Sequence, residues 1–138
     1  MTVLVDTPIW SFAYRRAKRS VAEQAATDEL IRLIRRERAV LIGAIRQEVL
    51  SGISDAARFE QVRLTLRGFG ELRASTAEYE HAAMLNNICR RKGVQGSPTD
   101  FLICAVALHY DALVFTTDRD FKRYARHTGI QLHYPNPK

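Results

Sequence analysis

The chain has 138 residues, 46% of them hydrophobic, which is enough for one well-packed core and too few for two ordinary domains. We therefore expect a single domain over residues 1–138, with a frayed tail from about residue 134. No signal-like segment opens the chain, and no apolar run reaches the roughly 20 residues that span a bilayer, so the expected location is cytoplasmic, away from membranes. The 21 basic and 15 acidic residues give a net charge of +6, which makes a polyanion a plausible partner.

Arginine accounts for most of the basic excess. Its planar guanidinium binds phosphate in a bidentate manner that lysine cannot match. The basic residues gather in three groups: Arg15, Arg16, Lys18 and Arg19; Arg32, Arg35, Arg36 and Arg38; and Arg90, Arg91 and Lys92. Any one group is also what a solvated helix face carries, so only their combination favours a nucleic acid.

The first half of the chain predicts strands that alternate with helices. Residues 3–5 form a short apolar strand ending at Asp6, with Pro8 near the start of the next helix. A capping box at residues 20–23 begins an amphipathic helix that continues to about residue 37. Its expected core positions are Val21, Ala25, Leu30, Leu33 and Ile34. The remaining elements of this half are a strand over 39–42, a helix that carries Glu48, a helix over about 55–67 and a strand near Leu72.

The second half continues the alternation. A capping box at Ser75 and Glu78 begins a helix that stops at Gly93. Ser97 is the expected N-cap, and Pro98 the first residue, of an apolar helix that the core surrounds. The remaining elements are a buried strand over 112–115, a helix over 121–129 and a final strand over 130–133. This order predicts an α/β fold with a central, mostly parallel, five-stranded sheet flanked by helices.

Carboxylates gather at one edge of this predicted sheet. Asp6 follows the first strand, Asp118 and Asp120 follow the fourth, and Glu48 lies in the helix after the second. Open α/β sheets bind their ligands at this carboxyl edge. Asp100, at the head of the apolar helix, belongs to the same region. Three of these acids also have an ordinary explanation, as a helix cap for Asp6 and Asp100 and as a solvated surface residue for Glu48.

Converging carboxylates repel one another and need a cation to remain ionised together. A hard divalent ion such as Mg²⁺ or Mn²⁺ prefers their oxygens, and one or two such ions promote displacement at phosphorus. Other chemistries lack their patterns: the two cysteines have no CxxC spacing and are expected to be buried thiols, and the four histidines have no HExxH spacing. No serine or cysteine triad is recognisable.

Four segments resemble the PIN-domain nucleases, in particular the VapC-type toxins of bacterial toxin–antitoxin pairs. The segments are VDT at 5–7, EVLSG around Glu48, SPTDFLICAVA around Asp100 and TTDRDF at 116–121. The resemblance extends over nearly the whole chain and implies a PIN-like, three-layer fold.

By that resemblance, four acids correspond to metal-binding residues: Asp6, Glu48, Asp100 and Asp118. Asp120 corresponds to an additional acid that acts through a bound water, and Thr116 to its polar support. The resemblance also implies a Mg²⁺- or Mn²⁺-dependent endoribonuclease that cleaves structured RNA, such as a transfer RNA or a ribosomal RNA loop, and so inhibits translation.

The same resemblance implies a homodimer and a VapB-type antitoxin whose C-terminal segment covers the acidic site. An antitoxin arginine that reached Asp6, Asp100 or Asp118 would replace the positive charge of the metal.

Two other functions remain open. A haloacid-dehalogenase-like phosphatase also has an acid after its first strand, but it normally carries a DxD there, whereas Asp6 is followed by Thr7 and Pro8. A catalytically silent RNA-binding or antitoxin-binding module would use the arginines and keep the acids as helix caps. Metal-dependent RNA cleavage separates these alternatives from the nuclease.

Overall fold

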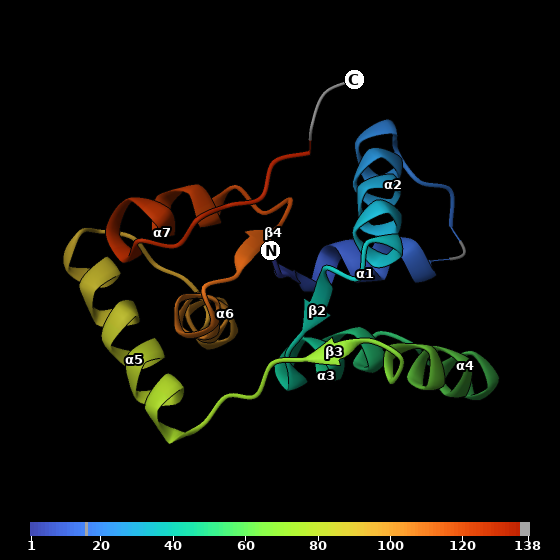
Figure 1. The fold of residues 1–138 in the computed structure, drawn as a ribbon, viewed down its shortest axis with the longest axis horizontal. Coiled ribbons are helices and arrows are strands. Elements are labelled where there is room, and N and C mark those ends of the chain that lie inside the picture. The colour runs from blue at the N-terminus through green and yellow to red at the C-terminus, as the bar shows by residue number, and fades with distance from the viewer. Residues whose placement is uncertain (16, 136–138) are drawn as a thin grey trace.

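Four parallel strands form the centre of the computed structural model, which describes residues 1–15 and 17–135. The strand order is β3-β2-β1-β4. Figure 1 shows α1 to α4 on one side of the strands and α5 to α7 on the other. Right-handed crossovers that run outward from β1 to β3 and then return to β4 place the helices in this way. The predicted α/β architecture with a parallel sheet flanked by helices is confirmed.

The elements follow the expected alternation. Their bounds are β1 (Val3–Val5), α1 (Thr7–Tyr14), α2 (Val21–Arg35), β2 (Ala39–Leu41), α3 (Gly43–Ser51), α4 (Ala56–Leu66), β3 (Gly70–Glu71), α5 (Thr76–Arg91), α6 (Pro98–Tyr110), β4 (Leu113–Phe115) and α7 (Asp120–Thr128).

The register of β1 and β4 determines where the polar ends of these strands meet. Val3 pairs with Leu113 and Val5 with Phe115, so the two strands end at the same level. The backbone amide of Asp6 then donates to the carbonyl of Phe115 at 2.9 Å. Residues that follow the two strands are therefore neighbours, although about 110 positions separate them in the sequence.

Helix α6 is the most deeply buried helix among the described residues. Its residues 101 to 107 are all buried, between the sheet and α5. Ser97 caps its start, because the Ser97 hydroxyl accepts a hydrogen bond from the amide of Asp100 at 3.1 Å. A capped helix embedded in the core holds the residues of its first turn in a fixed position.

The fifth predicted strand is wrong. Residues 130–133 contribute only one isolated parallel bridge, between Val114 and Leu132, where the amide of His133 donates to the Val114 carbonyl at 2.7 Å. Gly129 ends α7 with a φ of 84°, and Pro135 has no N–H to donate. The short segment between them meets β4 only around Leu132.

One strand boundary and two expected core positions also differ from expectation. Strand β3 is Gly70–Glu71 rather than a strand at Leu72, although the Leu72 amide still donates to the Leu41 carbonyl at 2.9 Å. Val21 is 90% exposed and Ala25, one turn further along α2, is also exposed, because the face of α2 that carries both residues is turned to solvent. The buried residues of α2 are Ala26, Thr27, Glu29, Leu30 and Leu33.

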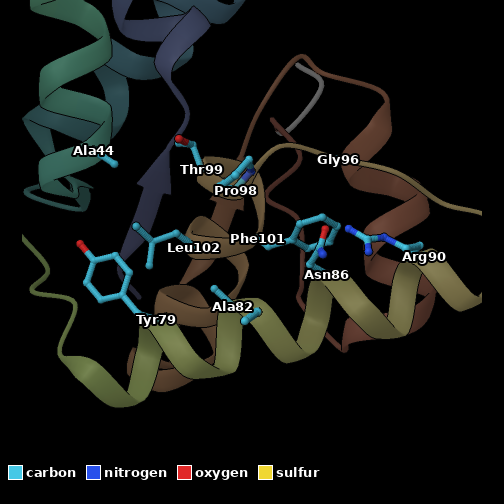
Figure 2. A pocket seen from close by; sticks show the side chains of 11 residues that line it. Ala44, Tyr79, Ala82, Asn86, Arg90, Gly96, Pro98, Thr99, Phe101 and Leu102 are labelled. Carbon is cyan, nitrogen blue, oxygen red and sulfur yellow. The ribbon is translucent and has the colours of Figure 1, made fainter.

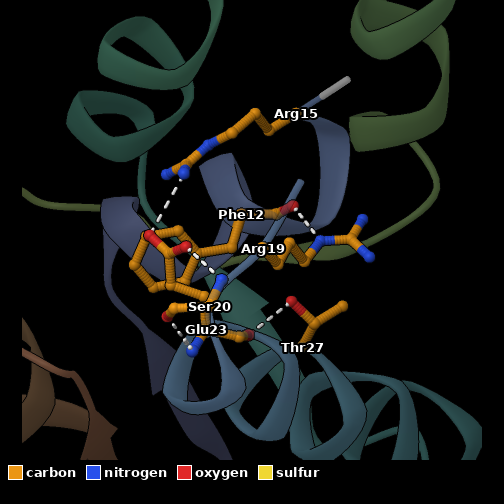
Figure 3. A network of polar contacts seen from close by, with 6 residues as sticks. All are labelled: Phe12, Arg15, Arg19, Ser20, Glu23 and Thr27. Atoms are coloured by element: carbon orange, nitrogen blue, oxygen red, sulfur yellow. Dashed lines mark hydrogen bonds and ion pairs between the residues drawn. The ribbon is translucent and has the colours of Figure 1, made fainter. Parts of the chain in front are cut away.

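Polar contacts hold the connection between α1 and α2 (Figure 3). Arg15 forms an ion pair with Glu23 at 3.1 Å, and Arg19 donates to the carbonyl of Phe12 at 2.7 Å. Ser20 and Glu23 complete the predicted capping box. Much of the first basic group therefore has a local structural role. Its member Arg16, and residues 136–138 of the expected tail, lie outside the described residues.

Both cysteines, Cys89 and Cys104, are buried and unpaired, as expected. In residues 1–15 and 17–135, no helix is both long enough and apolar enough to cross a membrane.

Candidate active site

Asp6 lies at the carboxyl end of β1, where its side chain is only 5% exposed. One carboxylate oxygen accepts the amide of Thr7 at 2.8 Å, so Asp6 is indeed the N-cap of α1. The other oxygen accepts the hydroxyl of Thr116 at 2.8 Å. The second contact joins β1 to β4 and has no part in capping. Asp6 is therefore both a helix cap and a member of a long-range polar cluster.

The electrostatic setting of Asp6 is unfavourable. Burial, and to a smaller extent the nearby carboxylates of Asp100 and Asp118, raise the pKa of Asp6 to about 6, against the lowering effect of the bonds from Thr116 and Thr7. Negative charges from three separate segments therefore act on one another at this edge of the sheet. A cation placed among them would reverse this effect on the pKa of Asp6.

The turn between β4 and α7 fixes Asp118 and Asp120. The hydroxyl of Thr116, while it donates to Asp6, also accepts the amide of Asp118 at 3.0 Å. One carboxylate oxygen of Asp118 in turn accepts the amide of Asp120 at 2.9 Å. This continuous chain of hydrogen bonds links Asp6 to the first residue of α7 and orients the acids relative to each other.

Asp100 has a partner from the other side of the site. The phenol of Tyr124, in α7, donates to one carboxylate oxygen of Asp100 at 2.7 Å. Tyr124 is fully buried, with its ring 4.9 Å from that of Phe101 and 5.0 Å from that of Phe121. Burial, together with the bond to Asp100, raises the pKa of Tyr124, so the phenol keeps the proton that it donates.

Glu48 is more loosely attached to this cluster. It lies on the exposed face of α3, and its carboxylate accepts the hydroxyl of Thr7 at 2.7 Å. Thr7 also donates its amide to Asp6, so a single residue connects the two acids. Glu48 reaches the edge of the site through Thr7, in a more solvated position than Asp6.

Two residues of this network, Thr7 and Tyr124, were not singled out from the sequence. The sequence places Tyr124 in the helix predicted over 121–129 and gives no role to its hydroxyl. A buried tyrosine requires a hydrogen-bond partner for its hydroxyl, and that requirement is the signal that could have drawn attention to it. The sequence does not identify Asp100 as this partner, because the contact depends on how α7 packs against α6.

The donor set fits a hard metal ion in its chemistry, since carboxylate and hydroxyl oxygens are what Mg²⁺ and Mn²⁺ bind. Within residues 1–15 and 17–135, however, no three His, Cys, Asp or Glu side chains form an arrangement that would hold a metal alone. Mg²⁺ usually keeps several waters and takes one or two carboxylates together with phosphate oxygens. A partial shell of this kind is what the cluster can offer.

A groove of about 570 Å³ runs between α5 and α6 (Figure 2). Its floor is mainly apolar, with Ala82 and Leu102, while Asn86 and Arg90 add polar groups toward the carboxyl end of α5. Thr99 is in its wall and directly precedes Asp100 in the first turn of α6. The groove therefore adjoins the acidic cluster but does not contain it.

Comparisons with known proteins agree with this fold. The chain's fold is similar to that of VapBC2 from Rickettsia felis bound to a DNA fragment from their promoter, with a TM-score of 0.75 and 17% identity, covering 96% of this chain and 98% of that one. It is also similar to FitAcB from Neisseria gonorrhoeae, with a TM-score of 0.71 and 18% identity, covering 96% and 97%.

DNA-bound VapBC from Salmonella typhimurium gives a TM-score of 0.71 and 19% identity, covering 96% and 97% of the two chains. No curated protein matches the sequence. The sequence model of the PIN domain matches residues 3–127, which include all the acids of the cluster. As its sequence segments predicted, the chain belongs to the PIN domain family.

Proposed function

We propose that this PIN-domain chain is a Mg²⁺- or Mn²⁺-dependent endoribonuclease that cleaves structured RNA, a transfer RNA or a ribosomal RNA loop, and acts as a VapC-type toxin that inhibits translation. PIN domains are generally nucleases, and the similar solved structures include VapBC complexes. The observation that carries the proposal is the acidic cluster around Asp6, where the carboxylates of Asp100 and Asp118, from two other segments, help to raise the pKa of Asp6. Stability alone gives no reason for this arrangement.

In this proposal, Asp6, Glu48, Asp100 and Asp118 hold the metal, and Asp120 contributes through a bound water. When bound, a divalent ion supplies Lewis acidity toward a phosphate and toward water. The residues of the chain provide orientation. Thr7 and Thr116 each fix one oxygen of Asp6, and Tyr124 fixes one oxygen of Asp100. The other oxygen of Asp100, and the second lone pair on each oxygen of Asp6, are then available to an ion.

We also propose a VapB-type antitoxin as a partner, since the neighbouring structures are complexes of this kind. An arginine of the antitoxin inserted among the acids would neutralise the charge that raises the pKa of Asp6. Co-expressed antitoxin that bound the chain and left cleavage unaffected would contradict this role. The place of action we propose is the cytoplasm, where its RNA substrate and ribosomes are.

A second copy of the chain is the occupant we propose for the groove between α5 and α6. Exposed Tyr79 lines the groove, and Met84 is a further exposed apolar side chain of α5, so a homodimer interface there would have apolar side chains to bury. Sedimentation at increasing concentration tests this proposal. A chain that stays monomeric throughout would contradict it.

The nuclease proposal is tested by incubating labelled RNA with the wild-type chain, with and without Mn²⁺. We expect cleavage that EDTA abolishes and that Asp6→Asn or Asp100→Asn lowers at least about 100-fold, the scale of one lost preorganised electrostatic contact. Asp111→Asn is the matched control. Asp111 is exposed and lies just before β4, so it is at the amino ends of the strands, away from the acidic cluster. Asparagine tolerates its left-handed conformation, with φ of 54°.

Each alternative function predicts a different result. RNA binding without cleavage, unchanged by the Asp6 and Asp100 substitutions, would contradict the enzyme and favour the silent binding module. Release of phosphate from a small phosphomonoester, dependent on Asp6, would favour the phosphatase. Equal loss of activity in Asp111→Asn and Asp6→Asn would show that the acidic cluster has no special role.

A further inference from the structure

Helix α7 has two faces with opposite character. Phe121 and Tyr124 are buried against the rest of the protein. The exposed face carries four cationic side chains: Arg119, Lys122, Arg123 and Arg126. Their spacing of three and four residues places them in one stripe, about 10 Å long from the rise of a helix. No apolar side chain lies within this stripe of exposed positions, which we call the α7 basic stripe.

The charges of the α7 basic stripe are not neutralised within the chain. Among residues 1–15 and 17–135, no ion pair joins any of its four side chains to a carboxylate. Other arginines do have such partners, as Arg15 has Glu23 and Arg32 has Glu29. The sequence groups that include Arg15 and Arg32 therefore have less free positive charge than their composition indicates.

The position of the stripe relates it to the acidic cluster. Arg119 lies between Asp118 and Asp120, so the stripe begins at the cluster and extends away from it along α7. The carboxyl end of α5, with exposed Arg90 and Arg91, lies beside α7 (Figure 1). A phosphate that approaches several carboxylates is repelled by them, and cations immediately adjacent counter that repulsion.

We propose that the α7 basic stripe binds the phosphates of the RNA strand that flank the scissile bond. This inference rests on the proposed nuclease function and names the residues that hold its substrate. Arginine and lysine on a helix face bind a nucleic-acid backbone through charge and hydrogen bonds without reading its sequence. A protein partner fits the stripe less well, because protein interfaces have an apolar or aromatic centre and this surface has none.

The test measures binding of a labelled stem-loop RNA to the full chain in EDTA, so that no cleavage occurs, over a range of salt concentrations. The variant Arg123→Gln/Arg126→Gln removes two charges from the stripe. Its matched control, Arg35→Gln/Arg36→Gln, removes two exposed arginines where α2 leads into β2. These arginines lie at the amino ends of the strands, away from the acidic cluster.

We expect the α7 variant to bind RNA at least about 10-fold more weakly at moderate salt. The slope of log affinity against log salt should fall by about 1.4, or about 0.7 for each lost contact to a single strand. The control should keep the wild-type slope. Wild-type affinity in the α7 variant, or the same loss in the control, would overturn the proposal. Lys122→Glu provides a second variant, with a larger expected loss because it reverses a charge.

Cleavage by the wild-type chain with Mn²⁺ is measured on the same RNA. If the wild type cleaves and the α7 variant binds as tightly as the wild type, the proposed nuclease stands and the role of the stripe is refuted. If the wild type never cleaves RNA, the proposed function is refuted, and the assignment of the stripe to its substrate is refuted with it. Thermal unfolding of each variant establishes that it is folded.

Discussion

At the scale of single residues, Asp6 combines a favourable and an unfavourable role. Its carboxylate caps α1 through the amide of Thr7, yet burial and neighbouring acids raise its pKa to about 6. The folded chain therefore holds this proton more tightly than the unfolded chain, in which the pKa is near the ordinary value of 3.8. Ionisation of Asp6 destabilises the fold, so stability does not explain a carboxylate at this position, whereas a metal-binding role does.

The raised pKa gives a prediction for stability in metal-free buffer. Between about pH 4 and pH 6 the folded state binds more protons than the unfolded state, so the free energy of unfolding should fall as the pH rises, and level off above pH 6. Asp6→Asn removes the charge. It should stabilise the protein by about 2 to 3 kcal/mol at pH 7.5, and by little at pH 4.

Urea unfolding at several pH values measures this difference between Asp6→Asn and the wild type. With Mn²⁺ present, the wild type should gain stability by mass action, and the variant should gain much less. A stabilisation by Asp6→Asn that was the same at pH 4 and pH 7.5 would contradict the raised pKa.

The acids of the candidate site other than Glu48 could be predicted because each follows a strand or begins a helix, positions that the sequence marks by an abrupt change from apolar to polar residues. The hydroxyl partners could not. The sequence predicts Thr116 as a polar support for Asp120, whereas its hydroxyl donates to Asp6. The bonds made by Thr7 and Tyr124 were not predicted. Such contacts depend on how α7 and α1 are rotated about their axes, which apolar periodicity specifies too coarsely.

At the scale of elements, the loop before α6 and helix α7 are fitted to each other at Gly96. A Cβ atom at this position would lie 2.3 Å from the phenol oxygen of Tyr124 and 2.7 Å from its Cζ atom. The ring of Tyr124 lies against the rings of Phe101 and Phe121 and has little room to move. Glycine is therefore required for a close approach that directs the phenol to Asp100.

Gly96→Ala should destabilise the protein by about 1 to 3 kcal/mol through overpacking. By displacing the phenol it should also weaken Mn²⁺ binding about 10-fold, the effect expected when the partner of a metal-binding carboxylate is lost. Tyr124→Phe should reproduce the weaker Mn²⁺ binding while it keeps the packing of the ring.

Gly43→Ala is the matched control for this change. A Cβ at Gly43 would have nothing within 4 Å, and alanine favours the first turn of α3, so this variant should be as stable as the wild type or slightly more stable. Urea unfolding and Mn²⁺ titration provide both measurements. Unchanged stability and unchanged Mn²⁺ affinity in Gly96→Ala would show that the loop moves aside and that the fit is unimportant.

The helices and the inner strands were predictable because caps and long apolar runs mark them, as at Ser97 for α6. The outer strands of the sheet were not predictable. Residues 130–133 have a strand-like composition, yet they make a single bridge because Gly129 and Pro135 confine the segment from both sides. At the other edge, β3 is only two residues long, and no sequence pattern of that length specifies a boundary.

At the scale of the whole molecule, the strand order produces the site. Because β1 lies between β2 and β4, the residues after β1 and β4 meet, and α3, which follows β2, brings Glu48 to their border. The sequence predicted that the carboxyl ends of parallel strands share one edge. It did not predict which unpaired cations surround that edge, since the free charge on α7 becomes evident only when the ion pairs of the other arginines are known.

The most direct test of the central claim, that acids from separate segments form one metal site, is a crystal of the chain soaked in Mn²⁺ and measured at the manganese absorption edge. We expect an anomalous peak within coordination distance of the Asp6, Asp100 and Asp118 carboxylates, and no such peak in crystals of Asp6→Asn. A peak elsewhere, or no peak among these acids at millimolar Mn²⁺, would contradict it.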